Sequence, residues 1–250
     1  MAIALDVLTH ITAKRPACSA VIAAAGSSER MGREDKLFLE IQGMPVLVHS
    51  LLPFQNSKQI DEIIVVARGD MLERVGGLCV RHGINKVTKV MAGGQTRVES
   101  VMSGVFAISK KSTLVAIHDG ARPCVGMATI KYAIDAAAKY HTAAPAIPVS
   151  STIKKAKNNY VTATIDRDGL FEIQTPQVFD ADLIKAALTK AVKAAKDITD
   201  DCMAAELIGA SVRLTEGSRL NIKITTKEDL NLAEAIIMFN AVCGPQGTRD

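Results

Sequence analysis

Tryptophan is absent from the chain, and the other aromatic residues are scarce, so that aromatics make up only 4% of the 250 residues. Proteins that bind single-stranded nucleic acid stack bases on aromatic rings, and this scarcity argues against such a platform. Lysine and arginine exceed aspartate and glutamate by four charges, spread without a long block of one sign. An excess this small does not indicate nucleic-acid binding, and we expect no nucleic-acid partner.

Long apolar runs and cysteine pairs are missing as well. No run approaches the roughly 18 apolar residues that cross a bilayer, so we expect no membrane partner. The five cysteines form no C-x-x-C motif, which favours a reduced, cytoplasmic setting over a disulfide framework. In residues 1–17 the positive charges follow the apolar part, the wrong order for a secretory signal. We therefore interpret 1–17 as an N-terminal extension.

The chain does have the composition of a globular protein, with 48% hydrophobic and 22% charged residues. Its length corresponds to between one and two domains of about 150 residues. Because no linker-like segment divides the chain, we predict a single domain over residues 18–243. Residues 244–250 are then a C-terminal tail.

Short apolar runs alternate with helical patterns through the first 150 residues. The runs typical of buried strands cover 19–24, 62–67, 87–91, 114–117 and 143–149. The helical patterns between them cover about 45–55, 70–82, 96–108 and 127–140. Strands that alternate with helices imply right-handed crossovers, so the sequence predicts an α/β fold with a mostly parallel sheet.

This alternation breaks after Pro148. Residues 150–174 have no helical period but contain β-prone pieces at 160–165 and 170–173, separated by turn residues. The pattern predicts a β-arm over 150–170 that leaves the main body. Beyond the arm we expect a helix over 180–196, an element at 200–209, a strand near 212–215 and a helix over 227–239 with a Thr-x-x-Asp start.

The loop after the first strand, AAAGSSERMG followed by Lys36, is a candidate phosphate site. Its small residues let backbone N–H groups approach an anion, and Arg30 and Lys36 supply positive charge. The loop fits neither the dinucleotide-binding fingerprint nor the P-loop pattern. An ordinary surface turn with solvated charges is an equally good interpretation.

Four later segments carry the other candidates. The turn at Gly93-Gly94 could present backbone groups to an anion or a base, or could simply precede a helix capped by Thr96. In HDGARP, Asp119 and Arg122 could hold a metal, a ribose or a phosphate, or form a structural ion pair. The third of these segments is TPQ at 175–177. In the last, on a probable strand at 221–225, Lys223 is either an edge gatekeeper or a phosphate ligand.

Taken together and in this order, these segments resemble the 2-C-methyl-D-erythritol 4-phosphate cytidylyltransferases of the non-mevalonate isoprenoid pathway. The resemblance extends from about residue 18 to 239 and rests on AAAGSSERMG with Lys36, AGGQTRVESV, HDGARP, DRDGL, TPQVF, TDD and NIKITTKEDL. It implies a Rossmann-like nucleotidyltransferase fold with a twisted, mostly parallel sheet. It also implies a protruding β-arm that interlocks two subunits of a homodimer, and dependence on CTP and Mg²⁺.

The resemblance further implies roles for individual residues. It implies catalytic roles for Arg30, Lys36 and Lys223. It implies that CTP contacts Ala24, Ala25, Gly26, Gly94, Ser100 and Asp119. It implies that the second substrate, 2-C-methyl-D-erythritol 4-phosphate, contacts Arg122, Thr152, Arg167 and Thr175. Mg²⁺ is expected to bind mainly through the phosphates of CTP, with no protein ligand assigned.

Two alternatives remain at this point. Ribitol 5-phosphate cytidylyltransferases share the glycine loop, the Asp-x-x-Arg-Pro segment and TPQ, but the DRDGL segment at 166–170 resembles the methylerythritol enzymes more closely. A non-catalytic nucleotide-binding module is the other alternative. It would have no need to keep Arg30, Lys36 and Lys223 together, so we favour the enzyme.

Overall fold

The computed structural model describes residues 15–26, 35–194 and 198–243 of the chain. Most of the predicted N-terminal extension 1–17 and the whole predicted tail 244–250 lie outside these residues. Arg30, predicted as a catalytic residue, also lies outside the described residues.

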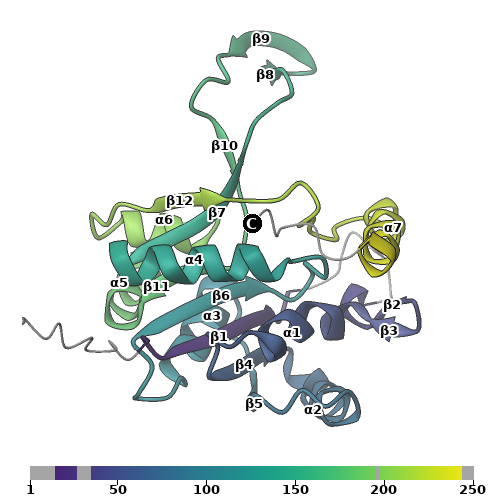
Figure 1. Cartoon of the computed structure of the whole chain (residues 1–250). Helices are drawn as coiled ribbons and strands as arrows, with labels where there is room; N and C mark the ends of the chain where they lie inside the picture. The colour runs from purple at the N-terminus through teal and green to yellow at the C-terminus, as the bar shows by residue number, and fades with distance from the viewer. Residues whose placement is uncertain (1–14, 27–34, 195–197, 244–250) are drawn as a thin grey trace, which may run out of the picture.

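Four parallel strands form one half of the central sheet (Figure 1). β1 (Cys18–Ala24) lies between β6 (Leu114–Asp119) and β4 (Glu62–Ala67), and β5 (Val87–Ala92) forms the edge beside β4. β6 is buried throughout, and β1 and β4 are buried at all but one position each. Burial on both faces explains why these strands are continuous apolar runs in the sequence.

The other half of the sheet is mixed. β11 (Gln177–Asp180) pairs antiparallel with β6 and with β7 (Thr142–Pro148). β10 (Phe171–Ile173) is antiparallel to β7, whereas β12 (Arg213–Glu216) runs parallel to it. The predicted α/β fold with a mostly parallel sheet is confirmed.

Helices cover both faces of the sheet (Figure 1). The core of one face includes residues of α1 (Val46–Asn56), α2 (Leu72–Arg81) and α4 (Met127–Tyr140). The core of the other face includes residues of α3 (Arg97–Phe106), α5 (Ala181–Lys193) and α6 (Asp201–Glu206). Side chains of β1 alternate between the two cores: Ala20 and Ile22 pack in the first, and Val21 packs in the second.

A third, smaller core lies beneath the last helix, α7 (Lys227–Cys243), near the short hairpin of β2 (Glu40–Ile41) and β3 (Met44–Pro45). The predicted Thr-x-x-Asp start of this helix is confirmed. The Asp229 amide donates to Thr226 Oγ1 at 3.3 Å, and the Thr226 amide donates to Asp229 Oδ2 at 2.9 Å. These reciprocal bonds satisfy two backbone donors at the helix start.

The arm projects from the sheet as a two-stranded hairpin, shown at the top of Figure 1. β8 (Ile153–Lys157) pairs antiparallel with β9 (Tyr160–Ile165), and every residue of both strands is exposed. The connecting residues Asn158 and Asn159 have φ values of 51° and 65°. Two successive positive φ angles match the type I′ turn that joins twisted antiparallel strands. The structure thus has the β-prone excursion where the sequence predicted it.

The strands β2, β3 and β11 were not predicted from the sequence, and the helix that follows the arm was predicted too long. The β2–β3 hairpin consists of two-residue strands, too short to leave a periodic pattern. In β11 only Val178 and Phe179 are apolar, and this pair is too short to indicate a strand. The helix predicted over 180–196 is α5, which ends at Lys193.

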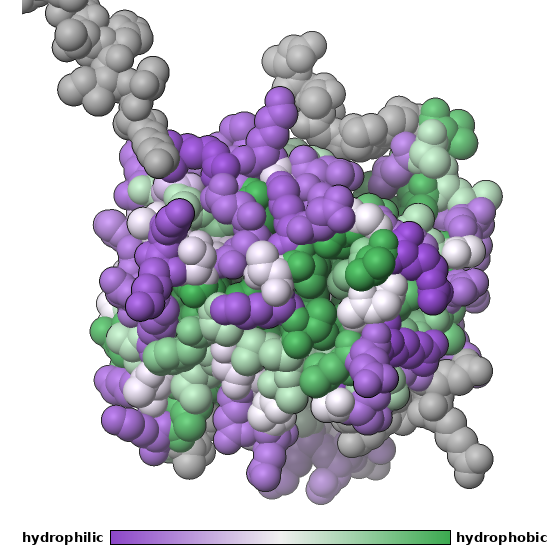
Figure 2. All heavy atoms as spheres, turned by 90° about the horizontal axis from the view of Figure 1, so that it is seen from below, coloured by the Kyte–Doolittle hydropathy of each residue, from purple (hydrophilic) through white to green (hydrophobic). Residues whose placement is uncertain are grey.

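On the face opposite the arm, hydrophobic side chains gather in the middle and hydrophilic ones surround them (Figure 2). A shallow hollow beside the edge strand β5 is lined in part by Cys79, Val80, Val87 and Val90, and Val80 is 84% exposed. Within the described ranges, no helix is both long and apolar enough to cross a membrane.

Gly104 lies inside α3, where that helix packs on the sheet. A Cβ atom added there would lie 2.5 Å from Cγ1 of Val21 and 2.7 Å from Cγ2 of Val66, and both valines are fully buried. We expect Gly104→Ala to lower the free energy of unfolding by about 1–3 kcal/mol, because overpacking outweighs the better helix propensity of alanine. The matched control is Gly76→Ala in α2, where an added Cβ meets nothing within 4 Å. Urea unfolding followed by circular dichroism should show the control to be neutral or stabilised, and equal losses would contradict the packing argument.

Candidate functional site

The carboxyl ends of the parallel strands border a pocket of about 380 Å³. In open α/β sheets, ligands bind at this end of the strands, where the connecting loops diverge. The pocket is lined by Ala23, Ala24, Ala25, Gly26, Lys36, Leu37, Gly94, Gln95, Thr96, Arg97, Ser100, Asp119, Ala121 and Lys223. It therefore unites all the described residues predicted to contact CTP with both described lysines predicted to be catalytic.

Lys36 reaches the pocket from a short 3-10 turn, η2 (Lys36–Phe38). The side chain of Asp35 caps this turn and accepts from the Leu37 amide at 3.2 Å. Lys36 Nζ donates to the carbonyl oxygen of Ile224 at 3.0 Å, which ties it to the loop that carries Lys223. Two lysines far apart in the sequence consequently face one pocket.

The turn between β5 and α3 forms a second wall of the pocket. Gly93 approaches the β1 loop so closely that an added Cβ would lie 2.5 Å from Ser100 Oγ and 2.7 Å from Ala25 Cβ. Thr96 begins α3 with a full capping box, in which Thr96 Oγ1 accepts from the Glu99 amide and the Glu99 carboxylate accepts from the Thr96 amide. The predicted helix cap at Thr96 is confirmed, and the same turn lines the pocket.

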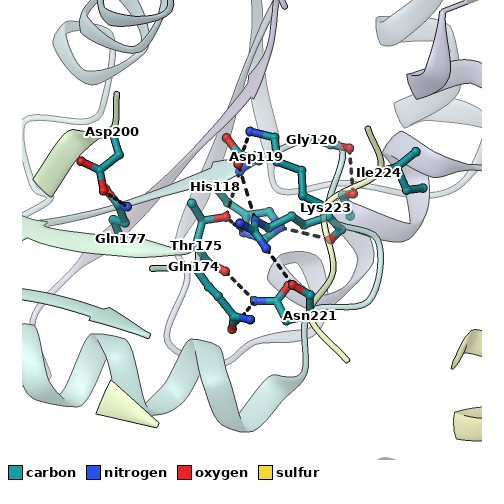
Figure 3. A network of polar contacts seen from close by, with 12 residues as sticks. His118, Asp119, Gly120, Gln174, Thr175, Gln177, Asp200, Asn221, Lys223 and Ile224 are labelled. Atoms are coloured by element: carbon teal, nitrogen blue, oxygen red, sulfur yellow. Dashed lines mark hydrogen bonds and ion pairs between the residues drawn. The ribbon is translucent and has the colours of Figure 1, made fainter. Parts of the chain in front are cut away.

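Asp119, the last residue of β6, is the carboxylate around which the charges of the pocket gather. Its Oδ2 lies 2.9 Å from Lys223 Nζ and 3.5 Å from Arg122 Nε, and its Oδ1 lies 3.7 Å from Arg97 Nη2. Figure 3 shows Lys223 and Asp119 pointing toward each other. Burial would raise the pKa of Asp119, but these cations outweigh burial and hold that pKa well below its usual range. Asp119 is therefore ionised at neutral pH.

Sequence reasoning assigned no role to Arg97, although it lines the pocket. Its guanidinium forms a two-pronged contact with Asp201, with Nη1–Oδ1 at 3.0 Å and Nη2–Oδ2 at 2.8 Å. The side chain of Asp201 is fully buried. Burial opposes the charge of Arg97, but Asp201 and Asp119 raise its pKa further above the ordinary arginine value. Its place at the start of a helix that follows a strand end was the one signal in the sequence.

His118 and Thr175 lie beneath the pocket rather than in its wall. His118 is fully buried, with Nδ1 2.9 Å from Thr175 Oγ1 and Nε2 3.3 Å from the Arg122 carbonyl oxygen. Burial lowers the pKa of His118 to about 4, so the ring is neutral at pH 7. Thr175 Oγ1 also accepts from the Asp119 amide at 3.2 Å. His118 is thus a core residue whose two ring nitrogens both have polar partners.

Arg122 forms the structural ion pair with Asp119 that the sequence left open. Its Nη1 donates to the carbonyl oxygen of Asn221 at 2.7 Å, and its side chain is only 12% exposed. Arg122 therefore links the end of β6 to the loop before α7. It lies beside the pocket and is not among the residues that line it.

The strand predicted at 221–225 is wrong, because the backbone there is irregular. Ile222 and Ile224 pack in the third core, which explains the alternating apolar pattern of the sequence. Their backbone groups, however, bond to single partners: the Ile224 amide donates to Ala121 at 2.8 Å, and the Ile224 carbonyl accepts from Lys36. Because there is no strand at 221–225, Lys223 is not a gatekeeper at a strand edge.

Thr152 and Arg167, predicted to contact the second substrate, lie on the arm and are exposed. Arg167 Nη1 donates to the carbonyl oxygen of Ser150, so the Arg167 side chain is bound to another residue of the arm. Neither residue lines the pocket of this chain.

Across the described part of the chain, no group of three or more His, Cys, Asp or Glu is placed to hold a metal ion. Asp119 is the acidic residue among those that line the pocket, and its oxygens face three cations. A Mg²⁺ ion keeps few protein ligands where phosphates supply oxygens. A divalent cation in this pocket would therefore need most of its ligands from a bound molecule.

Comparisons with known proteins give one answer over nearly the whole chain. The family model of 2-C-methyl-D-erythritol 4-phosphate cytidylyltransferase matches residues 18–238. A protein of that name from Halalkalibacterium halodurans is 43% identical over 220 residues, which cover 88% of this chain and 96% of the relative. Another, from Caldanaerobacter subterraneus, is 44% identical over 222 residues, which cover 88% and 98%. The solved structure of 4-diphosphocytidyl-2C-methyl-D-erythritol synthase from Anaerococcus prevotii matches with a TM-score of 0.78 at 33% identity, covering 89% of this chain and 96% of that one.

Cys124, two residues after Arg122, is predicted to be chemically inert. Burial raises the pKa of its thiol to about 12. At pH 8 the thiolate fraction is then lower by roughly three orders of magnitude than that of an exposed thiol with its ordinary pKa near 8.5. We expect brief alkylation at pH 8, read by mass spectrometry, to label Cys124 at least about 100-fold more slowly in the native protein than in urea. Similar rates in both states would show that the thiol is accessible and ionised.

Proposed function

The chain belongs to the 2-C-methyl-D-erythritol 4-phosphate cytidylyltransferase family, and from this premise we propose how its pocket performs the reaction. The protein is a CTP-dependent cytidylyltransferase. It transfers a cytidylyl group from CTP to 2-C-methyl-D-erythritol 4-phosphate and gives 4-diphosphocytidyl-2-C-methyl-D-erythritol and pyrophosphate, a step in the biosynthesis of isoprenoid precursors.

One observation carries the proposed mechanism: Lys36 and Lys223 face the same pocket at the carboxyl ends of the strands. The reaction joins two anions that repel each other, so it needs fixed positive charge more than any other group. Lys36 is tied to Ile224, the neighbour of Lys223, by a 3.0 Å hydrogen bond, and this bond keeps the two cations together. We assign both lysines, with Arg30, to binding and neutralising the phosphates.

We place CTP along the pocket wall. Ala24, Ala25 and Gly26 present a loop with almost no side chain, which lets backbone N–H groups approach the phosphates. Gly94 and Ser100 line the same pocket from the turn between β5 and α3 and from α3 itself, where backbone and hydroxyl groups can bind the edge of the cytosine base. Asp119, at the end of β6, is assigned to the nucleotide. In this arrangement the triphosphate lies beside Lys36 and Lys223.

2-C-methyl-D-erythritol 4-phosphate is placed beyond Asp119, on the side of Arg122 and Thr175. Arg122 is fixed by Asp119 and by the Asn221 carbonyl oxygen, so its guanidinium is oriented before the substrate arrives. Thr175 is held by His118 and by the Asp119 amide. Thr152 and Arg167 complete this half of the site from the arm.

The chemistry requires no general base. A phosphate monoester has a second pKa near 6, so most of the attacking phosphate is a dianion at pH 7. One of its oxygens forms a bond to the α-phosphorus of CTP, and the bond from that phosphorus to the bridging oxygen breaks. Pyrophosphate leaves with the electron pair. His118, neutral and buried beneath the pocket, is accordingly given no part in proton transfer.

We propose Mg²⁺ as the cofactor. The donor set fits a metal held mainly by the phosphates of CTP, because Asp119 is the one carboxylate among the described residues that line the pocket. When bound, Mg²⁺ would neutralise phosphate charge and draw electron density from the α-phosphorus. The protein would contribute the lysines and the orientation of the two substrates.

We further propose that the enzyme is a homodimer built through the arm. Every residue of β8 and β9 is exposed in the single chain, including the apolar Tyr160 and Val161 at 79% and 63%. An isolated hairpin is at best marginally stable in water, so the arm needs a surface to pack on. A two-fold exchange of arms would supply that surface and would bring Thr152 and Arg167 to the pocket of the partner.

The alternatives have no observation in their favour. Neither a ribitol 5-phosphate specificity nor a non-catalytic nucleotide-binding role is supported by any comparison, and the family membership supports the methylerythritol substrate. Turnover of the two polyol phosphates with CTP, read by pyrophosphate release, tests the activity directly. The cytoplasmic location stays a prediction from the sequence.

Removal of either pocket lysine should abolish most of the turnover. We expect Lys36→Ala and Lys223→Ala each to lower kcat/KM by at least about 100-fold, because a charge-assisted contact made mainly in the transition state is worth roughly 3 kcal/mol. The measurement is the rate of pyrophosphate release at varied CTP. Lys227→Ala is the matched control, since Lys227 is exposed at the start of α7 and lies outside the pocket. Near wild-type turnover in a pocket variant, with the control also unchanged, would remove the role assigned to that lysine.

Arg167 should act on the pocket of the partner subunit. We expect Arg167→Ala and Lys36→Ala homodimers each to be nearly inactive, because each lacks one cation at every site. In a heterodimer of the two variants, one site has an intact pocket from one chain and an intact arm from the other. Purified heterodimers carrying two different affinity tags should therefore recover activity at up to half of their sites.

The same experiment decides against the arrangement if nothing is rescued. Heterodimers verified by mass spectrometry but inactive would place Arg167 at the site of its own chain. A fully active monomer by light scattering would remove the homodimer. Either result leaves the cytidylyltransferase activity, measured on the wild type in parallel, untouched.

A further inference from the structure

An ion pair in the wall of the pocket, with a buried carboxylate, has no part in the mechanism proposed above. Asp201, in the first turn of α6, is fully buried, and its carboxylate makes the two-pronged contact with Arg97 on α3. A buried carboxylate is costly unless a cation and further hydrogen bonds compensate it. Arg97 is the only one of the pair that reaches the pocket, and its side chain is 29% exposed there.

Asp201 is itself held in place by the sheet. Gln177, on β11, accepts hydrogen bonds from the amides of Asp201 and Cys202 at 3.0 Å each, and its Nε2 donates to Asp200 Oδ2 at 2.9 Å. The side-chain contact between Gln177 and Asp200 is visible in Figure 3. Asp200 also caps α6 by accepting from the Met203 amide at 2.9 Å. The start of α6 is thus fixed to a buried strand, and so is the carboxylate that holds Arg97.

Arg97 faces two carboxylates at once. Its Nη2 lies 2.8 Å from Asp201 Oδ2 and 3.7 Å from Asp119 Oδ1. On the other side of Asp119, Oδ2 faces Lys223 at 2.9 Å and Arg122 at 3.5 Å. Because Arg97 attracts Oδ1 while Lys223 and Arg122 attract Oδ2, the Asp119 carboxylate is held in one rotational orientation. That carboxylate in turn holds the ammonium group of Lys223, a long side chain that is 41% exposed.

We propose that the Arg97–Asp201 pair is a positioning device that sets the Asp119 carboxylate, and through it the Lys223 ammonium group, before the nucleotide binds. This inference rests on the proposed role of Lys223 in binding phosphate. Arg97 is a positioning residue here, because Asp201 engages both of its terminal nitrogens and one of them, Nη2, also faces Asp119. Without the pair, only Lys223 and Arg122 would attract the Asp119 carboxylate, which could then rotate. The Lys223 ammonium group would no longer have a partner held in one orientation.

The first test compares Arg97→Ala, Asp201→Asn and the double variant. Each single variant should lower kcat by about 10- to 100-fold, because a misplacement of about 1 Å of a group in the site can cost about 100-fold in rate. Because both residues act through one path, the double variant should be no worse than the poorer single one within about threefold. Arg15→Ala is the matched control. It breaks the two-pronged Arg15–Asp61 pair at the opposite ends of the strands, and it should leave kcat unchanged.

Chemical rescue separates positioning from a structural role. Arg97 is partly exposed in the pocket wall, so ethylguanidinium can enter the space left in Arg97→Ala. It should restore kcat at least about tenfold without a matching rise in the thermal unfolding midpoint. Asp201→Asn combined with Arg97→Ala should abolish the rescue, because the anchoring carboxylate is gone. Arg97→Lys should stay impaired, since an ammonium group cannot bridge both carboxylates as the planar guanidinium does.

Crystal structures of the ligand-free wild type and Arg97→Ala give a readout that needs no turnover. We expect the Asp119 carboxylate to be rotated in the variant and its contact with Lys223 Nζ to be lost or moved. An unchanged Asp119–Lys223 contact, additive losses in the double variant, or equal rescue with and without Asp201 would each overturn the inference. An inactive wild type would instead contradict the proposed function, and the crystallographic comparison would still decide the inference. If Asp201→Asn fails to fold, Arg97→Ala and Arg97→Lys carry the test.

Discussion

The site depends on one carboxylate at the end of one buried strand. Asp119 lies within 3.7 Å of the charged groups of Lys223, Arg122 and Arg97, which would repel one another without it. Because β6 is buried along its whole length between β1 and β11, the backbone of Asp119 cannot move without disturbing the core. The sheet therefore fixes the anion, and the anion fixes the cations. Three positive groups are thus assembled around Asp119 before any ligand arrives. In the proposed mechanism, in which this charge meets a triphosphate, less reorganisation is then needed during the reaction.

The loop that carries Lys223 is held by polar contacts instead of a strand ladder. Gln174 donates to the Ser218 carbonyl at 2.8 Å and accepts from the Ser218 amide at 3.1 Å, and Asn221 donates to the Thr175 carbonyl at 2.9 Å. At Gly217 an added Cβ would lie 2.8 Å from Gln174 Oε1, so this approach requires a glycine. Side-chain hydrogen bonds thus replace regular secondary structure at the point where a lysine must leave the core and face the pocket.

Whether the sequence predicts a feature of this molecule depends on how far apart in the sequence the interacting residues lie. Local periodicity identified the buried strands β1, β4, β6 and β7, and local sequence also identified the helix cap at Thr96, because neighbours in the sequence determine these features. Motif order predicted catalytic roles for Lys36 and Lys223, and both lysines line the pocket. The Arg97–Asp201 pair joins residues 104 positions apart, so local sequence patterns do not reveal it. Each residue, taken alone, reads as an ordinary polar residue in the first turn of a helix. The false strand at 221–225 arose because Ile222 and Ile224 alternate as a strand does while packing beneath a helix.

The arm is the opposite case: its local sequence specifies the hairpin, but the hairpin lacks the packing that would stabilise it. Its turn is well specified, because Asn158 and Asn159 adopt the positive φ angles that a type I′ hairpin requires. Its strands nevertheless bury none of their side chains within the single chain. Backbone pairing alone does not offset the conformational entropy of ordering a hairpin in water. In the proposed homodimer, ordering of the arm and association of the subunits are therefore one event. A site that takes Thr152 and Arg167 from a partner's arm would then form only when the dimer does, which couples catalysis to assembly without any further regulatory element.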